Sequence, residues 1–293
     1  MIILDYSGIT MPAFFSLGEK NFTPTMLRHY ILNSIRMYNL KFRDEYGKLV
    51  IACDAGNSWR KQVFSEYKQQ RKKKRDESEI DWSAIYKVIN DVRDDLKKFF
   101  PYPVISVYGS EADDVIATLV QHRCVETNAL GYEIAKPTVI VSGDRDFIQL
   151  QKFDNIIQFS PVQKKFVLPK NSPERDLKEH IIKGCKTDGV PNVFSSNDVF
   201  VKGERQRTIR KKFLAEMVED ESSIPVKFLK NYERNKKCIS FEFIPESLRK
   251  KILEEFDKEI CKPSPGPKLL NYFIKNRLGE LTKSISDFTI SNK

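Results

Sequence analysis

Acidic residues occur at the ends of short apolar runs in the first half of the chain. Three of them follow such runs closely: Asp5 after residues 2–4, Asp54 after residues 49–52 and Asp144 after residues 139–141. Short apolar runs between helical patterns are typical of buried strands in a parallel sheet. The carboxyl ends of neighbouring parallel strands lie along one edge of the sheet, where ligands usually bind. We therefore expect these three carboxylates to lie close together.

Further carboxylates are expected at the same edge. Asp146 stands two residues after Asp144, so an extended chain would direct both side chains the same way. Glu111, Asp113 and Asp114 fall in the first turn of a predicted helix, where the helix dipole favours anions. The sequence thus predicts as many as seven carboxylates at one rim.

Such a cluster requires cations, because carboxylates a few ångströms apart raise one another's pKa values. Oxygen ligands without a nearby group of His or Cys suit Mg²⁺ or Mn²⁺. Two such ions about 4 Å apart can activate a water and stabilise the leaving oxygen of a phosphodiester. Taken singly, each of these acids is more often a helix cap or a turn residue. Only their shared position at one sheet edge favours a metal site.

The elements that would position these acids belong to a predicted α/β fold. Residues 104–107 are a fourth candidate strand, and helices are expected at residues 23–43, 82–99 and 110–125, the last opening on a sequence that resembles a capping box. Beyond about residue 170 the apolar residues are spaced helically. We expect a mainly parallel central sheet flanked by helices. The predicted division is an α/β domain at residues 1–169 and a helical, basic C-terminal region at residues 170–293.

Composition favours a soluble intracellular protein. The chain has 293 residues, of which 40% are hydrophobic, and no apolar run approaches the length of about 18 residues that a membrane span needs. Asp5 interrupts the first apolar stretch, which argues against a signal peptide. The five cysteines are widely spaced and form no CxxC pair, so neither a disulfide framework nor a zinc site is expected. The three histidines are scattered, and we assign them no role.

The net charge of +10 lies mostly in the second half of the chain. Residues 161–293 hold 28 Lys and Arg against 19 Asp and Glu, whereas residues 1–160 hold 22 against 21. A basic region of this kind favours a polyanionic partner, with nucleic acid the default and solubility alone the alternative.

Basic and aromatic residues are interleaved in a segment at about residues 59–80, which reads as a helix running into a charged stretch. Beside a carboxylate rim, cations could hold a nucleic-acid strand by its phosphates while aromatic rings stack on bases. The alternative is a solvated charged face. The candidate nucleic-acid contacts of this segment are Arg60, Lys61, Tyr67, Lys72, Lys73 and Lys74.

Four acidic motifs resemble, in order and spacing, those of the 5′ nuclease (flap endonuclease) superfamily. They lie at residues 3–7, 53–55, 108–114 and 142–147. Residues 26–34, 58–71, 201–205 and 265–273 further resemble the ribonucleases H of T-even bacteriophages, a branch of that superfamily. The resemblance covers nearly the whole chain, and the segment at residues 59–80 would be the family's helical arch.

The resemblance implies roles for individual residues. Asp5, Asp54, Glu111, Asp113 and Asp144 match the family's first metal site, Asp146 and Asp188 match the second, and Asp114 would assist. Lys68 and Arg71 match the arch residues that reach the scissile phosphate, where Lys68 would stabilise developing charge. Lys202, Arg205 and Arg207 lie in the region that grips duplex DNA by its backbone.

One position departs from the family pattern. Cys185 stands where the family usually has an Asp of the second metal site. Because Cys is a poor Mg²⁺ ligand, the substitution predicts a weakened second ion and puts flap endonuclease activity in question more than exonuclease activity.

The function that the resemblance implies is a 5′→3′ nuclease that acts through two Mg²⁺ ions, which Mn²⁺ can replace. It would have ribonuclease H and DNA exonuclease activities, with flap cleavage left open, and would remove RNA primers during lagging-strand replication. The expected partners are DNA and RNA–DNA duplexes with 5′ ends or flaps, a single-strand-binding protein and a sliding clamp, and the chain is expected to be a cytoplasmic monomer. The alternative is a non-catalytic, structure-specific DNA-binding protein, which Cys185 supports. A nucleotide-cofactor enzyme is disfavoured, since the chain has neither a P-loop nor a GxGxxG motif.

Overall fold

The computed structural model describes residues 1–18, 22–127, 133–261 and 268–288. Its central element is a six-stranded sheet in the order β3-β2-β1-β6-β7-β8. The strands are β1 (Ile2–Asp5), β2 (Leu49–Ala52), β3 (Val104–Ile105), β6 (Thr138–Val141), β7 (Ile156–Ser160) and β8 (Lys165–Val167). All neighbours pair in parallel except β7 and β8, which are antiparallel. The mainly parallel sheet is therefore confirmed, with a mixed edge that the sequence analysis did not predict.

The inner strands are apolar because both faces of the sheet are covered. Ile2 and Leu4 of β1 pack into one apolar core, whereas Ile3 packs into a second core on the opposite face. This alternation follows from the two-residue repeat of a strand. A separate two-stranded sheet, β4 (Val125–Thr127) with β5 (Glu133–Ala135), lies outside this arrangement.

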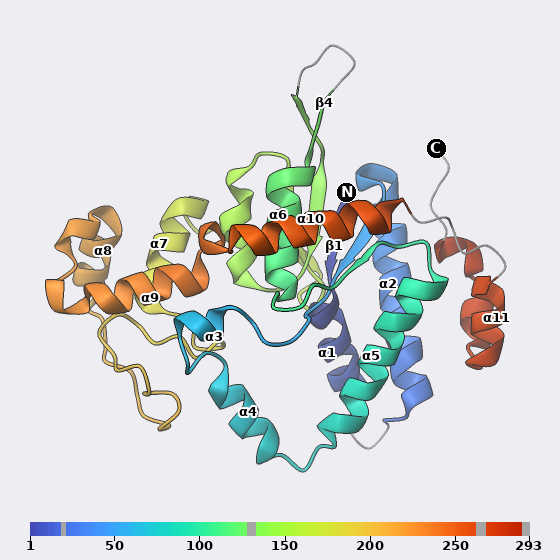
Figure 1. Cartoon of the computed structure of the whole chain (residues 1–293), viewed down its shortest axis with the longest axis horizontal. Helices are drawn as coiled ribbons and strands as arrows, with labels where there is room; N and C mark the ends of the chain where they lie inside the picture. Colours follow the sequence, from blue (N-terminus) through green and yellow to red (C-terminus); the bar gives the residue numbers. More distant parts are fainter. Residues whose placement is uncertain (19–21, 128–132, 262–267, 289–293) are drawn as a thin grey trace.

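One face of the sheet is covered by helices from both ends of the chain: α1 (Tyr6–Leu17), α2 (Pro24–Tyr46), α5 (Trp82–Phe99), α11 (Lys268–Lys275) and α12 (Gly279–Thr282). The side chain of Thr23 caps α2, accepting a hydrogen bond from the Met26 amide at 3.2 Å. The helix ends at Gly47, whose φ of 76° suits glycine. The two predicted helices on this face are thus confirmed, and α11 lies beside α2 in Figure 1.

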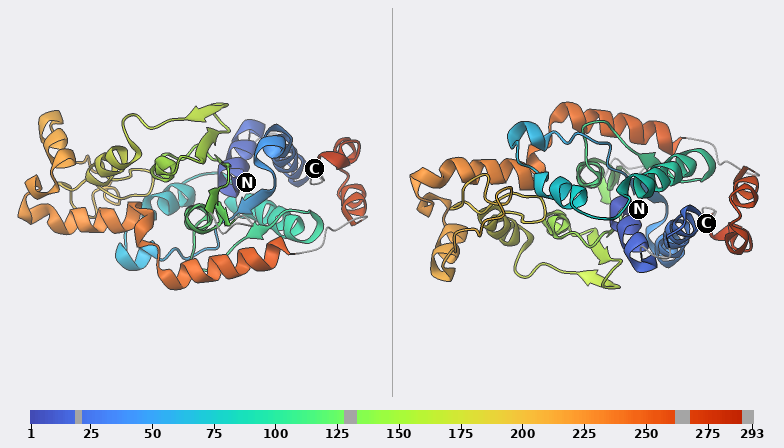
Figure 2. Two further views of the ribbon diagram at one scale, coloured as in Figure 1. Left: turned by 90° about the horizontal axis from the view of Figure 1, so that it is seen from above. Right: turned by 90° about the horizontal axis from the view of Figure 1, so that it is seen from below.

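The opposite face is covered by α6 (Ala112–Arg123), the 3₁₀ helix η2 (Arg145–Lys152) and α10 (Glu246–Ile260). Figure 2 shows α10 running along this side of the molecule, opposite α2. The capping box of α6 is real but starts one residue later than predicted, because it joins Glu111 to Asp114. The extended chain expected after Asp144 is wrong, since η2 begins there with Asp144 as its N-cap.

The remaining elements form a lobe to one side of the sheet (Figure 1). It holds α7 (Pro173–Lys183), α8 (Lys211–Glu219) and α9 (Leu229–Ile239), with the single-turn 3₁₀ helices η3 (Glu221–Ser223), η4 (Val226–Phe228) and η5 (Phe241–Phe243). A further 3₁₀ helix, η6 (Ile285–Phe288), lies outside the lobe and packs with α2 in the core on the first face of the sheet. The segment at residues 59–80 folds as two short helices, α3 (Arg60–Val63) and α4 (Gln69–Asp76), rather than one. Lys68 between them has a φ of 58°.

The expected division at residue 169 stays a prediction, although the C-terminal α10, α11 and α12 pack into the cores beside the sheet. The predicted loop at residues 264–267 lies outside the described residues, as does the start of the resemblance at residues 265–273. In the part of the chain that the structure describes, none of the helices combines the length and apolar character of a membrane span.

Candidate metal centre

Asp5, Asp54 and Asp144 meet at the carboxyl edge of the sheet, as the sequence predicts. Asp5 ends β1, and the other two follow the strands β2 and β6 that flank it. The Asp5 carboxylate accepts hydrogen bonds from the Gly8 amide at 3.0 Å and from the Ser142 hydroxyl at 2.8 Å. Burial raises the pKa of Asp5 to about 6; the charges of Asp54 and Asp144 act in the same direction, and the two hydrogen bonds oppose it.

Asp54 and Asp144 expose their side chains at this edge. Asp54 accepts a hydrogen bond from the Ala112 amide at 2.9 Å, which places the first turn of α6 against the end of β2. The Ser7 hydroxyl also donates to Asp54. Asp144 accepts from the Asp146 amide at 3.0 Å, so the tight turn into η2 brings both acids to the rim.

Asp113 and Asp146 are the acids of the site whose pKa values are raised furthest, so their ionised forms are the least stable without a cation. Burial raises the pKa of Asp113 well above its usual value, and the charge of Asp144 adds to the effect. Burial also raises the pKa of Asp146, with Asp144 and Asp188 acting in the same direction. Within the described residues, no hydrogen bond to the Asp113 carboxylate is present. These oxygens are therefore available to a cation.

Glu111 has the opposite electrostatic environment. Although burial raises its pKa, Lys68 and Arg60 lower it to a net value of about 2. The Lys68 ammonium lies 2.5 Å from one Glu111 oxygen, and the Tyr67 hydroxyl donates to the other at 2.8 Å. Glu111 is thus ionised and already neutralised by protein cations.

Asp188 extends the rim from the lobe. It accepts hydrogen bonds from the Tyr67 hydroxyl at 2.9 Å and from Arg71 at 2.5 Å, and the Lys68 ammonium lies 3.7 Å away. The Lys68 amide also donates to the Asp188 carbonyl at 2.8 Å. Lys68 and Arg71, expected to reach a phosphate, thus lie on the carboxylates of the rim.

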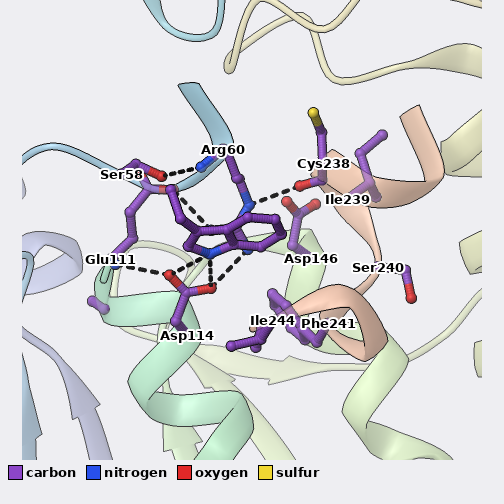
Figure 3. A network of polar contacts seen from close by, with 12 residues as sticks. Ser58, Arg60, Glu111, Asp114, Asp146, Cys238, Ile239, Ser240, Phe241 and Ile244 are labelled. Carbon is purple, nitrogen blue, oxygen red and sulfur yellow. Dashed lines mark hydrogen bonds and ion pairs between the residues drawn. The ribbon is translucent and has the colours of Figure 1, made fainter. Parts of the chain in front are cut away.

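Arg60 and Asp114 form a buried buttress beneath the rim (Figure 3). The Arg60 guanidinium is only 2% exposed and forms ion pairs with Asp114 at 2.9 Å and Glu111 at 3.1 Å. It also donates to the Cys238 carbonyl of α9 at 2.8 Å, while the Trp59 indole donates to Asp114. Such burial corrects the expectation that Arg60 contacts DNA. It also means that the fully buried Asp114 already has protein partners for its oxygens.

Of the other expected nucleic-acid contacts, Tyr67 does not fit a stacking role, because its ring is buried and its hydroxyl is bound to the rim. The remaining cations have exposed side chains: Lys61, Lys72, Lys73, Lys74, Lys202, Arg205 and Arg207. Lys202 is paired with Asp198 at 2.6 Å. Exposure leaves these residues accessible to a polyanion.

The groups that orient the acids were not predicted from the sequence. Ser142 and Ser7 bond to Asp5 and Asp54, and His180 lies with its Nδ1 atom 3.2 Å from Asp146. Each serine stands two residues from an acid of the rim, and this spacing could have indicated a hydrogen bond to a rim carboxylate. No sequence signal links His180 to an acid 34 positions earlier in the chain.

The donor set at the sheet edge fits a hard divalent cation. Its oxygens come from carboxylates alone, two of them exposed, and burial raises the pKa values of Asp5 and Asp113, with neighbouring carboxylates acting in the same direction. Mg²⁺ and Mn²⁺ prefer such oxygen ligands. The carboxylates at the sheet edge can therefore hold divalent ions beside the basic residues of the segment 59–80.

Two protein families and a curated relative match nearly the whole chain. The family described as 5′-3′ exonuclease, N-terminal resolvase-like domain, matches residues 1–176, and that described as T4 RNase H, C terminal, matches residues 171–288. The Ribonuclease H of Enterobacteria phage T4 is 34% identical over 300 residues, covering 98% of this chain and 95% of the relative.

Two solved structures share the fold. A T5 5′-exonuclease with bound zinc has a TM-score of 0.59 at 14% identity, and a bacteriophage T5 flap endonuclease complexed with DNA and metal ions has a TM-score of 0.59 at 16% identity. In each case the match covers 89% of this chain and 99% of the other.

Proposed function

Because the chain belongs to the 5′-3′ exonuclease family, with a C-terminal part of the T4 RNase H type, we propose that it hydrolyses phosphodiester bonds from the 5′ end of DNA and of RNA in RNA–DNA duplexes. The observation that carries the proposal is the meeting of Asp5, Asp54 and Asp144 at one sheet edge. A family fold without this carboxylate cluster would support only binding.

The proposed metal is Mg²⁺, with Mn²⁺ able to replace it. Two groups of side chains would hold two ions: Asp5, Asp54, Glu111, Asp113 and Asp144 for the first, and Asp146 and Asp188 for the second. When bound, the ions supply a nucleophilic water and stabilise the leaving oxygen. Asp114 is assigned a positioning role instead, since it holds Arg60 beneath Glu111.

Lys68 and Arg71 are proposed to act on the scissile phosphate. Both cations already lie at the rim, held by Glu111 and Asp188. A phosphodiester at the rim would offer them a second anionic partner a short movement away. Lys68 would then stabilise the charge that develops on the phosphate in the transition state, where a preorganised cation has its largest effect.

The exposed cations provide the proposed nucleic-acid grip. Lys61 and the run at residues 72–74 lie on α3 and α4, and Lys202, Arg205 and Arg207 lie before α8. Backbone contacts of this kind bind by structure rather than by sequence. We propose that the protein removes RNA primers together with a single-strand-binding protein and a sliding clamp. We propose further that it acts as a monomer in the cytoplasm. Flap cleavage is a further proposed activity.

The proposal is tested by incubating the purified chain with 5′-labelled forked DNA and RNA–DNA duplexes in Mg²⁺. We expect short products from the 5′ end, none in chelator and none with Asp144→Asn, while that variant still retards the duplex in a gel. The matched control is Asp154→Asn, an exposed acid outside the described site, which should cleave normally. Full activity of Asp144→Asn refutes the site, and binding without cleavage by the unmodified chain favours the non-catalytic alternative.

A further inference from the structure

A cluster of different chemistry adjoins the carboxylate rim. One donor atom each from Asp146, His180 and Cys185 lie within 4.8 Å of one another. We propose that these three residues bind a transition-metal ion of the Zn²⁺ or Co²⁺ type at the position of the family's second metal site, where in this chain Cys185 stands for an Asp and His180 adds a nitrogen donor. The proposal revises the expectation that the cysteines hold no zinc site.

The fold brings the three donors together from two neighbouring elements. Asp146 lies in the first turn of η2, His180 lies in the last turn of α7, and Cys185 follows that helix. Gly184 ends α7 with a φ of 70°, and a Cβ atom there would lie 2.3 Å from the Val190 carbonyl oxygen. The close turn therefore requires glycine.

The donors are also held in place. A β-bridge to Val190 fixes the Cys185 backbone, and the Thr187 hydroxyl lies 3.0 Å from its sulfur. His180 is already oriented towards Asp146, with the Nδ1 atom 3.2 Å from a carboxylate oxygen. Asp146 and Cys185 are each 8% exposed, so their donor atoms face one another rather than bulk water.

The ligand set selects the metal by its softness. A thiolate, an imidazole and a carboxylate suit Zn²⁺ and Co²⁺, whereas Mg²⁺ takes oxygen ligands and binds thiolates poorly. Zinc lies at about 2.3 Å from sulfur and about 2.0 Å from nitrogen, which sets tetrahedral ligand atoms about 3.5 Å apart. Donors within 4.8 Å of one another therefore need to approach by about 1.5 Å at most. The thiol releases its proton to solvent on binding. Three protein ligands leave one tetrahedral position open to water.

An ion can reach this cluster from outside. A cavity of about 220 Å³ is lined by Asp146 and His180 together with Gly184 and Lys183. Its lining comes from η2, α7, Gly184 and Lys170 and includes no residue of the segment 59–80. The negative charge of Asp188 also lies near Cys185 and favours a cation there.

Occupation of the cluster would affect cleavage through Asp146, a consequence that rests on the proposed function. An ion held by Cys185 and His180 would use the same carboxylate that is proposed for the second Mg²⁺. Low concentrations of Zn²⁺ should therefore inhibit Mg²⁺-dependent cleavage, and Cys185→Asp should relieve that inhibition.

Metal binding itself is tested without any nuclease assay. Co²⁺ is added to the metal-free full-length chain under reducing conditions, and its absorption spectrum is recorded. We expect a thiolate-to-cobalt charge-transfer band that saturates at one ion per chain and disappears in Cys185→Ser. Cys261→Ser is the matched control, because Cys261 is exposed and remote in sequence, and it should keep the band. His180→Gln should weaken Co²⁺ binding by about tenfold or more, as the loss of a metal ligand or its support does.

The outcomes separate the two proposals. A band that is absent from the unmodified chain, or that survives Cys185→Ser, overturns the metal site even if cleavage in Mg²⁺ is normal. A Cys185-dependent band in a chain that never cleaves supports the metal site and counts against the nuclease. Cys185→Asp guards against misfolding: it should bind Co²⁺ more weakly and without the charge-transfer band, and keep the far-ultraviolet circular dichroism of the unmodified chain.

Discussion

Replacing Asp5 by Asn tests whether the acidic rim destabilises the metal-free protein. Burial raises the pKa of Asp5 to about 6 from a model-compound value of 3.8. At about 1.4 kcal/mol for each pH unit, ionising Asp5 in the folded chain costs about 3 kcal/mol. Asn removes that cost but loses one of the hydrogen bonds with Gly8 and Ser142, worth about 1 kcal/mol. The metal-free variant should therefore be more stable by about 2 kcal/mol.

The sign of the pH dependence follows from the raised pKa. A carboxyl group with a higher pKa in the folded state binds more protons there, so stability falls as the pH rises between the two pKa values. The advantage of Asp5→Asn should be complete above about pH 6, shrink as the pH falls through that value, and vanish near about pH 4. Other acids of the rim titrate in both proteins, so the difference between them isolates Asp5.

The assay is thermal unfolding followed by circular dichroism in the presence of a chelator. A gain of about 2 kcal/mol should raise the Tm by about 4–8 °C in a chain of this size. Saturating Mg²⁺ should reverse the order, because an ion that binds only the folded unmodified site stabilises it by mass action. Asp154→Asn, at an exposed position, should change neither result. An Asp5→Asn protein that melts below the unmodified chain in chelator at neutral pH refutes the reasoning.

Further predictions concern the cations. Lys68→Ala should lower the single-turnover cleavage rate by about 10²–10³-fold with duplex binding retained in a gel-shift assay, and an unchanged rate would exclude its role at the phosphate. Asp114→Ala leaves the buried Arg60 guanidinium without its nearest carboxylate, so urea unfolding should show a loss of about 3 kcal/mol; a loss within error would count against the buttress. Replacing the three lysines at residues 72–74 by Ala should weaken DNA binding and reduce the salt dependence of log K by up to about 3, whereas an unaltered salt dependence would place the DNA elsewhere.

The parts of the fold set by local patterns could be predicted from the sequence. The apolar runs before Asp5, Asp54 and Asp144 became β1, β2 and β6, because a strand covered on both faces must be apolar throughout. The meeting of the three acids then followed from parallel topology. Thr23 and Pro24 marked the start of α2 for an equally local reason.

The parts set by distant contacts could not. Arg60 lies in a basic segment and looks solvent-exposed, yet Asp114 and Glu111 bury it as an ion-paired group. Tyr67 was expected to stack on bases, but its hydroxyl bridges Glu111 and Asp188. Local patterning carries no information about such partners, since each lies more than 40 positions away in the chain.

The packing of the last helices on the first ones bears on how this chain is made. Phe273 and Phe288 lie against Phe100, with ring centroids 5.9 and 5.4 Å apart, and Leu269 joins the same core as α2 and α5. During synthesis, a ribosome would display those earlier helices with a bare apolar face until the residues after 268 had left the exit tunnel. The packing of α2 and α5 is therefore completed late in synthesis, and a nascent chain stalled before α11 would be a substrate for chaperones.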